Sequence, residues 1–322
     1  MPVARAESWL EESQRRPVAA FWLVALLGPV GAALVVRLVS DSLSPLVSTL
    51  VIALAMPAPL IAAMVVGGRR PRALLQSLQA GFVRPVMTLL LPVVGALAWV
   101  LAALAFTGVL GNVAGVEGVG RIPGDTETVR ANLAELLDAE TAAAAEIPPV
   151  PVLVLLAVGG GIVAGFTLNG LLAFGEEYGW RGYLWERLEP RGRPATIGAI
   201  GALWGLWHAP LILVVGFNYP DDRLAGVVAM TAFTVAMSWP LDELRRATGS
   251  PVAPAILHGA INGTAGLFVL LTGGDRLWAA PMGLLGAAAF LPAGIAIHRL
   301  VDRTLAREQR PADGSLRPHR AA

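Results

Sequence analysis

Eight apolar runs, each about long enough to cross a bilayer, constrain this chain more than any other feature of its sequence. They cover residues 17–36, 45–66, 85–110, 149–174, 195–217, 224–240, 251–272 and 277–298. A helix needs about 20 mostly apolar residues to span the hydrocarbon core. A mean hydropathy of +0.64 and a charged fraction of only 15% are consistent with that architecture. We therefore predict an all-α, polytopic membrane helix bundle of about eight transmembrane helices.

The arginine residues are distributed unevenly between the two sides of this predicted bundle. Every basic residue is Arg, and nineteen of the 24 lie in the N-terminal segment, the even-numbered connections and the tail. Because connections rich in Arg stay on the cytoplasmic side, both termini are predicted to be cytoplasmic. We predict a cytoplasmic segment at 1–16, a single transmembrane bundle at 17–300 and a disordered cytoplasmic tail at 301–322. The expected location is the plasma membrane, as a multi-pass protein.

The rest of the composition excludes several kinds of chemistry. The chain has no Cys, which removes disulfides, a thiol nucleophile and Cys-ligated zinc. No basic patch points to nucleic acid. The longest outer connection, 111–148, is acidic, and Val129, Leu133, Leu136 and Leu137 share one face of a helical pattern. We predict a short amphipathic helix there, either as a surface connector, which is favoured, or as a lid over a site.

The fourth apolar run combines a helix-packing pattern with an acid pair. Gly161 and Gly165 form a small-xxx-small face, which permits close approach of a neighbouring helix. Glu176 and Glu177 stand at the end of the run, and Arg181 follows Glu177 by four residues, the spacing of a helical pair. Ionisable residues within spans are rare and usually functional. If the helix continues past Arg181, Glu176 lies inside the bundle; ion pairing at its rim is the alternative.

Two histidines lie within later runs. At about 1.5 Å per residue, His208 is roughly 20 Å and His258 about 10 Å from the cytoplasmic ends of their spans. Pro210 would loosen the helix beside His208, and Asn262 shares a helix face with His258. With Glu176, these residues can meet in the cytoplasmic half of a bundle. They provide the groups needed to activate water and stabilise an oxyanion, so water-mediated amide hydrolysis is the predicted reaction class.

The same residues carry a resemblance to a known family over about residues 150–275. The motifs are Glu176-Glu177-x-x-x-Arg181, Trp204-x-x-x-His208 and His258-x-x-x-Asn262. In this order they resemble the CPBP intramembrane proteases, or Abi family, which includes type II CAAX prenyl endopeptidases and proteins linked to bacteriocin processing and self-immunity. The resemblance implies that Glu176 and His208 activate water, that His258 and Asn262 form the oxyanion hole, and that Glu177 and Arg181 support them. Trp204 departs from the Phe that is common in the family.

The resemblance further implies a membrane-embedded endopeptidase that cuts a membrane-associated protein or lipidated peptide near the cytoplasmic face of the bilayer. It leaves the catalytic type open. Zinc could be ligated by Glu176, His208 and His258, as in a metalloendopeptidase, whereas a metal-free glutamate mechanism is favoured for prenyl-protease members. The alternative function is a non-catalytic bacteriocin-immunity or scaffold protein of the same fold. A transporter is less favoured, because no inverted repeat is evident.

Overall fold

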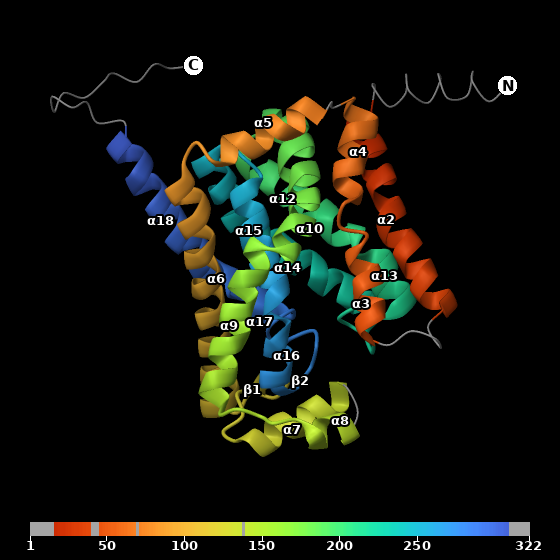
Figure 1. Ribbon diagram of the computed structural model, residues 1–322, viewed down its shortest axis with the longest axis vertical. Helices are drawn as coiled ribbons and strands as arrows, with labels where there is room; N and C mark the ends of the chain where they lie inside the picture. Colours follow the sequence, from red (N-terminus) through yellow and green to blue (C-terminus); the bar gives the residue numbers. More distant parts are fainter. Residues whose placement is uncertain (1–15, 40–44, 69–70, 137–138, 309–322) are drawn as a thin grey trace.

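The computed structural model describes residues 16–39, 45–68, 71–136 and 139–308 as a helical bundle (Figure 1). Its α-helices are α2 (Pro17–Val39), α3 (Pro45–Ala53), α4 (Ala58–Gly67), α5 (Pro71–Gly81), α6 (Pro85–Thr107), α7 (Thr126–Leu136), α8 (Ala139–Ala144), α9 (Val150–Phe166), α10 (Leu168–Glu177), α11 (Trp185–Leu188), α12 (Arg193–Trp207), α13 (Ala209–Val215), α14 (Arg223–Thr248), α15 (Val252–Gly263), α16 (Leu267–Leu270), α17 (Leu284–Ala288) and α18 (Phe290–Glu308). The two strands are β1 (Val119–Arg121) and β2 (Thr272–Gly274). The predicted all-α class is confirmed.

The number of spans is smaller than the predicted eight. Among the described residues, six helical segments are long and apolar enough to cross a membrane, or seven if the bent pair α9 and α10 counts as one span. The run at 251–272 accounts for the difference, because α15 ends at Gly263 and a 3₁₀ turn separates it from the short α16. Glycines at 263 and 266 disfavour a continuous helix there. The chain is nonetheless an integral, multi-pass membrane protein.

The fourth predicted run is bent rather than straight. The bend between α9 and α10 is 57° and falls at Thr167, whose φ and ψ of −125° and −130° are not helical. At Gly170 an added Cβ would lie only 1.8 Å from the carbonyl oxygen of Gly165. Only glycine fits at position 170, just after the bend. Beyond the bend, the residues of α10 from Ala173 to Glu177 are buried in the bundle.

Helix α15 lies at the centre of the bundle, and every residue from Val252 to Ile261 is buried. The predicted small-xxx-small packing is confirmed on the α9 side of this helix. A Cβ added at Gly161 would lie 2.6 Å from Cγ2 of Thr264, and one at Gly165 would lie 2.5 Å from the carbonyl oxygen of Ile256. The two backbones are thus in near contact, and α9 fixes one side of the helix that carries His258.

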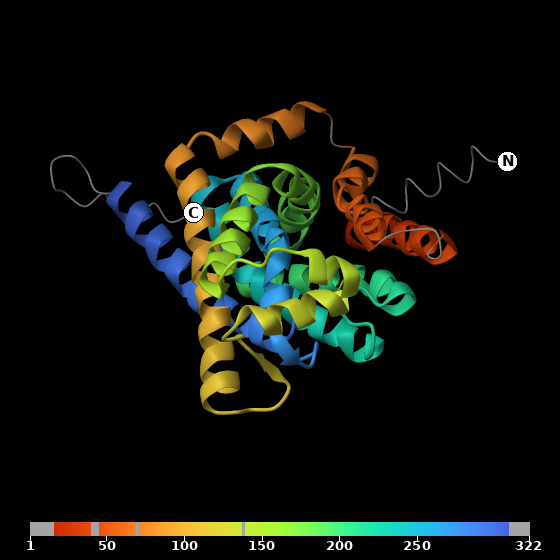
Figure 2. The same ribbon diagram turned by 60° about the horizontal axis from the view of Figure 1, so that its bottom comes forward.

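The connection at 111–148 contains a helix, α7, where an amphipathic helix is predicted, and β1, one strand of an unpredicted pair. Leu137 of the predicted apolar face lies outside the described residues. Val129 on α7 is 2% exposed, and Asp125 caps α7 by accepting hydrogen bonds from the Thr128 amide (2.8 Å) and hydroxyl (2.9 Å). These bonds lower the pKa of Asp125. β1 and β2 pair antiparallel, at the end of the bundle where α7 and α8 lie (Figure 2). The connection is thereby tied to the segment after α16.

At the opposite end, α18 continues further than the predicted start of a disordered tail at residue 301. It reaches Glu308, because Asp302 pairs with Arg246 (2.5 Å) and Glu308 pairs with Arg84 (2.7 Å). The rest of the predicted tail and nearly all of the predicted 1–16 segment lie outside the described residues. α5 crosses the bundle at this end (Figure 1).

Candidate active site

The acid pair lies on a helix that continues beyond α10. A π-helical turn (Tyr178–Leu184) follows α10 directly and leads into α11 and a 3₁₀ turn that ends at Arg191. Of the two alternatives that the sequence left open, the structure thus shows the one in which the helix continues past Arg181. Glu176, Glu177 and Arg181 are only 2%, 0% and 1% exposed, so all three lie inside the bundle rather than at its rim. Short π-helical turns are frequent at functional sites.

The two neighbouring glutamates have different partners. Oε2 of Glu177 accepts a hydrogen bond from Nη1 of Arg181 at 2.7 Å, and its Oε1 lies 2.9 Å from Nδ1 of His258. Oε2 of Glu176 instead accepts a hydrogen bond from Nε1 of Trp204 at 2.6 Å. Within the described part of the chain, Glu176 forms no ion pair with an arginine. The charge of Glu177 is balanced by a buried guanidinium, whereas the charge of Glu176 is not.

His208 lies where one long span is interrupted. It stands between α12 and α13 with φ −77° and ψ −12°, which confirms the expected effect of Pro210. Its Nδ1 is 2.9 Å from the carbonyl oxygen of Trp204. A carbonyl oxygen only accepts hydrogen bonds, so Nδ1 must carry the proton, and Nε2 of the neutral ring keeps its lone pair.

Trp204 connects the parts of the site. Besides the bond to Glu176, its ring lies edge-on to His258 at 5.0 Å and is tilted against His208 at 6.1 Å, measured between ring centroids. The guanidinium carbon of Arg181 is 5.1 Å from the centre of the same ring. Four of the other predicted site residues thus contact this indole, and Glu177 joins them through Arg181 and His258. His208 reaches this cluster through Trp204, by its backbone hydrogen bond and its ring contact.

Asn262 is the predicted residue that the structure does not bring into the cluster. It lies one helical turn beyond His258 on α15, and its side chain is exposed. In the described part of the chain, no hydrogen bond joins it to Glu176, Glu177 or His258. The spacing correctly placed it near His258 along the helix, but α15 ends at Gly263, and Asn262 lies in its last, incompletely covered turn.

The predicted zinc ligands do not form a metal site. Where residues are described, no group of three or more His, Asp or Glu side chains is arranged to hold a metal ion. Glu176, His208 and His258 are all described residues, so they do not fit zinc in this arrangement.

The motifs did not reveal the contribution of α14. Oγ of Ser238 accepts a hydrogen bond from Nη2 of Arg181 at 2.8 Å, and Nε of Arg245 donates to the carbonyl oxygen of Arg181 at 2.7 Å. Ser238 stands alone in an apolar run and gives little signal in the sequence. Arg245 lies beyond the predicted end of that run, in a stretch that resembles an ordinary cytoplasmic loop.

A second polar cluster joins α12, α14 and α18. Arg193 pairs with Asp242 and with Glu243, each at 2.6 Å. Arg246 also pairs with Glu243 at 2.6 Å, and Nδ1 of His298 lies 3.0 Å from Oε1 of Glu243. His298 was assigned no role from the sequence. These contacts hold the first turn of α12 against α14. Helix α12 carries Trp204 and ends directly before His208.

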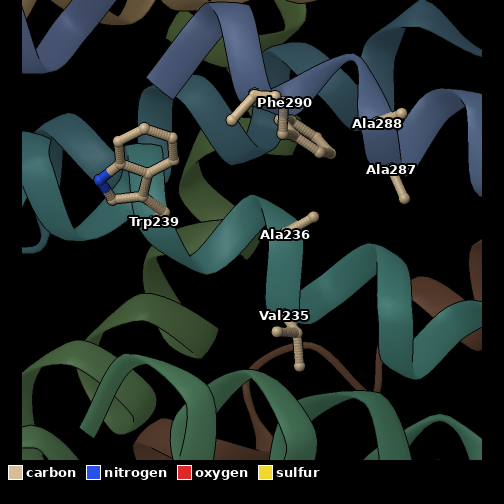
Figure 3. A pocket seen from close by; sticks show the side chains of 7 residues that line it. Val235, Ala236, Trp239, Ala287, Ala288 and Phe290 are labelled. Carbon is tan, nitrogen blue, oxygen red and sulfur yellow. The ribbon is translucent and has the colours of Figure 1, made fainter. Parts of the chain in front are cut away.

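An apolar hollow lies on a different face of α14. It has a volume of about 330 Å³ and opens between α14, α17 and α18 (Figure 3). Its lining residues are Val235, Ala236, Trp239, Ala287, Ala288, Phe290 and Leu291. None of the predicted site residues contributes to it, so the hollow is separate from the glutamate and histidine cluster.

Together, fold and site define a polytopic integral membrane protein with a buried cluster of ionisable side chains. Residues 148–264, little more than a third of the chain, match a family model described as Type II CAAX prenyl endopeptidase Rce1-like. The match includes every predicted site residue from Glu176 to Asn262, and it supports assignment of the chain to the CAAX protease family. The matched family model is that of a protease. No curated protein matches the chain.

Proposed function

We propose that this protein is an intramembrane endopeptidase of the CPBP and CAAX-protease type, with Glu176 as the general base. The observation that carries the proposal is the difference between the two buried carboxylates. Glu177 is neutralised by Arg181 at 2.7 Å, whereas Glu176 accepts the indole N–H of Trp204 and pairs with no arginine among the described residues. Within the described chain, no guanidinium therefore occupies the carboxylate of Glu176, which can accept a proton from a water molecule. A positioned general base contributes about 10²- to 10⁴-fold to a rate.

The histidines have complementary parts in this mechanism. His208 presents the lone pair of Nε2, because its Nδ1 donates to the Trp204 carbonyl, and it assists Glu176 in activating water. His258 donates to the oxyanion from Nε2. Since its Nδ1 donates to Glu177 at 2.9 Å, donation from Nε2 requires a proton on both ring nitrogens. Asn262 is the proposed second donor and engages on substrate binding, when catalytic hydrogen bonds tighten.

The proposed substrate is a membrane-associated protein or a lipidated peptide, cleaved near the cytoplasmic face of the plasma membrane. The burial of the cluster supports a membrane-associated substrate, since Glu176 and His258 lie on buried helices among segments long and apolar enough to span a membrane. We propose the metal-free, glutamate type of catalysis, because Glu176, His208 and His258 are not grouped to hold an ion.

The test is cleavage of a quenched-fluorescent farnesylated CAAX peptide by the purified protein in detergent. Glu176→Ala and His208→Ala are expected to abolish cleavage. Glu186→Ala should leave it unchanged, since this carboxylate is about half exposed on α11, away from the cluster. Each protein is measured with and without a zinc chelator.

Normal turnover by Glu176→Ala or His208→Ala would contradict the assignment. Loss of wild-type cleavage with chelator would replace the glutamate mechanism by a metal-dependent one. If the wild-type protein does not cleave the peptide, the proposed substrate class loses its support, and the non-catalytic alternative is favoured.

A further inference from the structure

The hydroxyl of Ser238 on α14 lies between Arg181 and the helix α12, which carries Trp204. Ser238 is 1% exposed. Its hydroxyl donates to the carbonyl oxygen of Thr234 at 2.7 Å, and its oxygen accepts the hydrogen bond from Nη2 of Arg181 at 2.8 Å. A guanidinium has only donors, and the single hydroxyl proton of Ser238 is directed at Thr234. The lone pairs of Ser238 are therefore oriented towards Arg181.

The same turn of α14 is packed tightly against α12. A Cβ added at Gly201 would lie 2.6 Å from Cα of Val235 and 3.0 Å from Oγ of Ser238. Oγ1 of Thr234 lies 2.9 Å from the carbonyl oxygen of Gly201. Trp204 follows Gly201 by three residues and is the indole that donates to Glu176. The turn of α14 from Thr234 to Ser238 thus binds Arg181 and also packs against the part of α12 that carries Trp204.

Arg181 is held by α14 at both ends. Nε of Arg245 binds its backbone carbonyl oxygen, and Ser238 binds one arm of its guanidinium. The other arm, Nη1, is then directed at Oε2 of Glu177. The guanidinium is planar and its N–H groups have a fixed geometry, so the position of one arm sets the position of the other. The orientation of the Glu177 carboxylate, and hence its contact with His258, depends on this arrangement.

We propose that Ser238 is a positioning residue that acts on Glu177 through Arg181. It contacts no reacting atom. The catalytic consequence rests on the proposed function, whereas the coupling between Ser238 and Arg181 is a property of the fold and can be measured without any substrate.

Ser238→Ala removes the acceptor for Nη2 and leaves a buried N–H without a partner. We expect kcat to fall about 10- to 100-fold, the range for loss of a hydrogen bond to a charged group, with KM changed less than about twofold, because substrate contacts are untouched. Thr248→Ala is the matched control. Thr248 is also a buried hydroxyl on α14, but it binds only the carbonyl oxygens of Leu244 and Ser250. This control should keep the wild-type kcat.

The decisive experiment combines Ser238→Ala with Arg181→Lys, which retains a positive charge near Glu177 but lacks the second arm. For each single variant and the double variant, kcat and the midpoint of thermal unfolding in detergent are measured. Contacting residues in one network have non-additive effects. We therefore expect Ser238→Ala to change neither quantity further in the Arg181→Lys background.

Additive effects on both quantities would overturn the proposal. Non-additive midpoints with additive effects on kcat would also overturn it, because Ser238 would then only stabilise the fold. If the wild-type protein cleaves no peptide, the proposed function fails by itself, and the midpoints still decide whether Ser238 and Arg181 are coupled.

Discussion

Gly165→Ala should misplace His258 without altering any side chain of the candidate site. The added Cβ would lie 2.5 Å from the carbonyl oxygen of Ile256 and 2.9 Å from both N and Cβ of Ala260. Two of these three atoms belong to the backbone of α15, so no change of rotamer relieves the overlap. Since His258 lies midway between Ile256 and Ala260, the segment pushed away is the one that carries the histidine.

The size of the effect follows from the overlap. Ordinary contact begins at 3.4 Å, so α9 and α15 must separate by about 0.9 Å at this point. A misplacement of about 1 Å costs on the order of 10²-fold in rate, and overpacking of a well-packed interior costs about 1–3 kcal/mol. We therefore expect kcat/KM for the farnesylated peptide to fall about 100-fold, together with a lower midpoint of thermal unfolding.

Gly160→Ala provides the control on the same helix. Nothing lies within 4 Å of a Cβ at this position, and alanine stabilises a helix by about 0.8–1.0 kcal/mol relative to glycine. This variant should keep the wild-type activity, and its unfolding midpoint should be no lower than that of the wild-type protein. The reasoning is refuted if Gly165→Ala matches Gly160→Ala in both measurements, because the α9 contact would then not determine where His258 lies.

Two further variants separate the roles of the residues around Glu176. Glu177→Ala should weaken cleavage rather than abolish it, and it should lower the unfolding midpoint more than Glu176→Ala does, because removing one member of a buried ion pair costs about 3–5 kcal/mol; equal loss of cleavage at both positions would favour paired catalytic roles. Trp204→Phe keeps an aromatic ring beside His258 but removes the N–H donated to Glu176, so we expect cleavage to survive with kcat lowered about tenfold; complete loss in a protein with a normal midpoint would show that the indole N–H is essential.

Much of the site was predictable because its signals are local. Glu177 and Arg181 are four residues apart on one helix, and that spacing alone predicts the pair that the structure contains. The same holds for Gly161 and Gly165, whose periodicity predicts a close helix contact. Pro210 interrupts its span at His208 because proline has no backbone N–H and its ring clashes with the preceding turn of the helix.

The parts that could not be predicted depend on contacts between distant segments. α15 was expected to span the membrane, but it is a short central helix whose burial comes from its neighbours rather than from its length. The strand pair β1 and β2 joins residues about 150 positions apart, and neither strand shows an alternating pattern long enough to recognise. The bend at Thr167 follows from the close approach of Gly170 to Gly165, which no periodicity reveals.

The environments of Glu176 and Glu177 also depend partly on local spacing and partly on contacts between distant segments. Adjacent carboxylates in a sequence are chemically equivalent, and only the spacing to Arg181 suggests that Glu177 is the paired one. That Glu176 faces an indole rather than a cation depends on the rotation of α12, which is fixed where Gly201 meets Val235 and Ser238 on α14. Helix α14, which carries no motif residue, therefore helps to determine which glutamate remains without a cationic partner among the described residues.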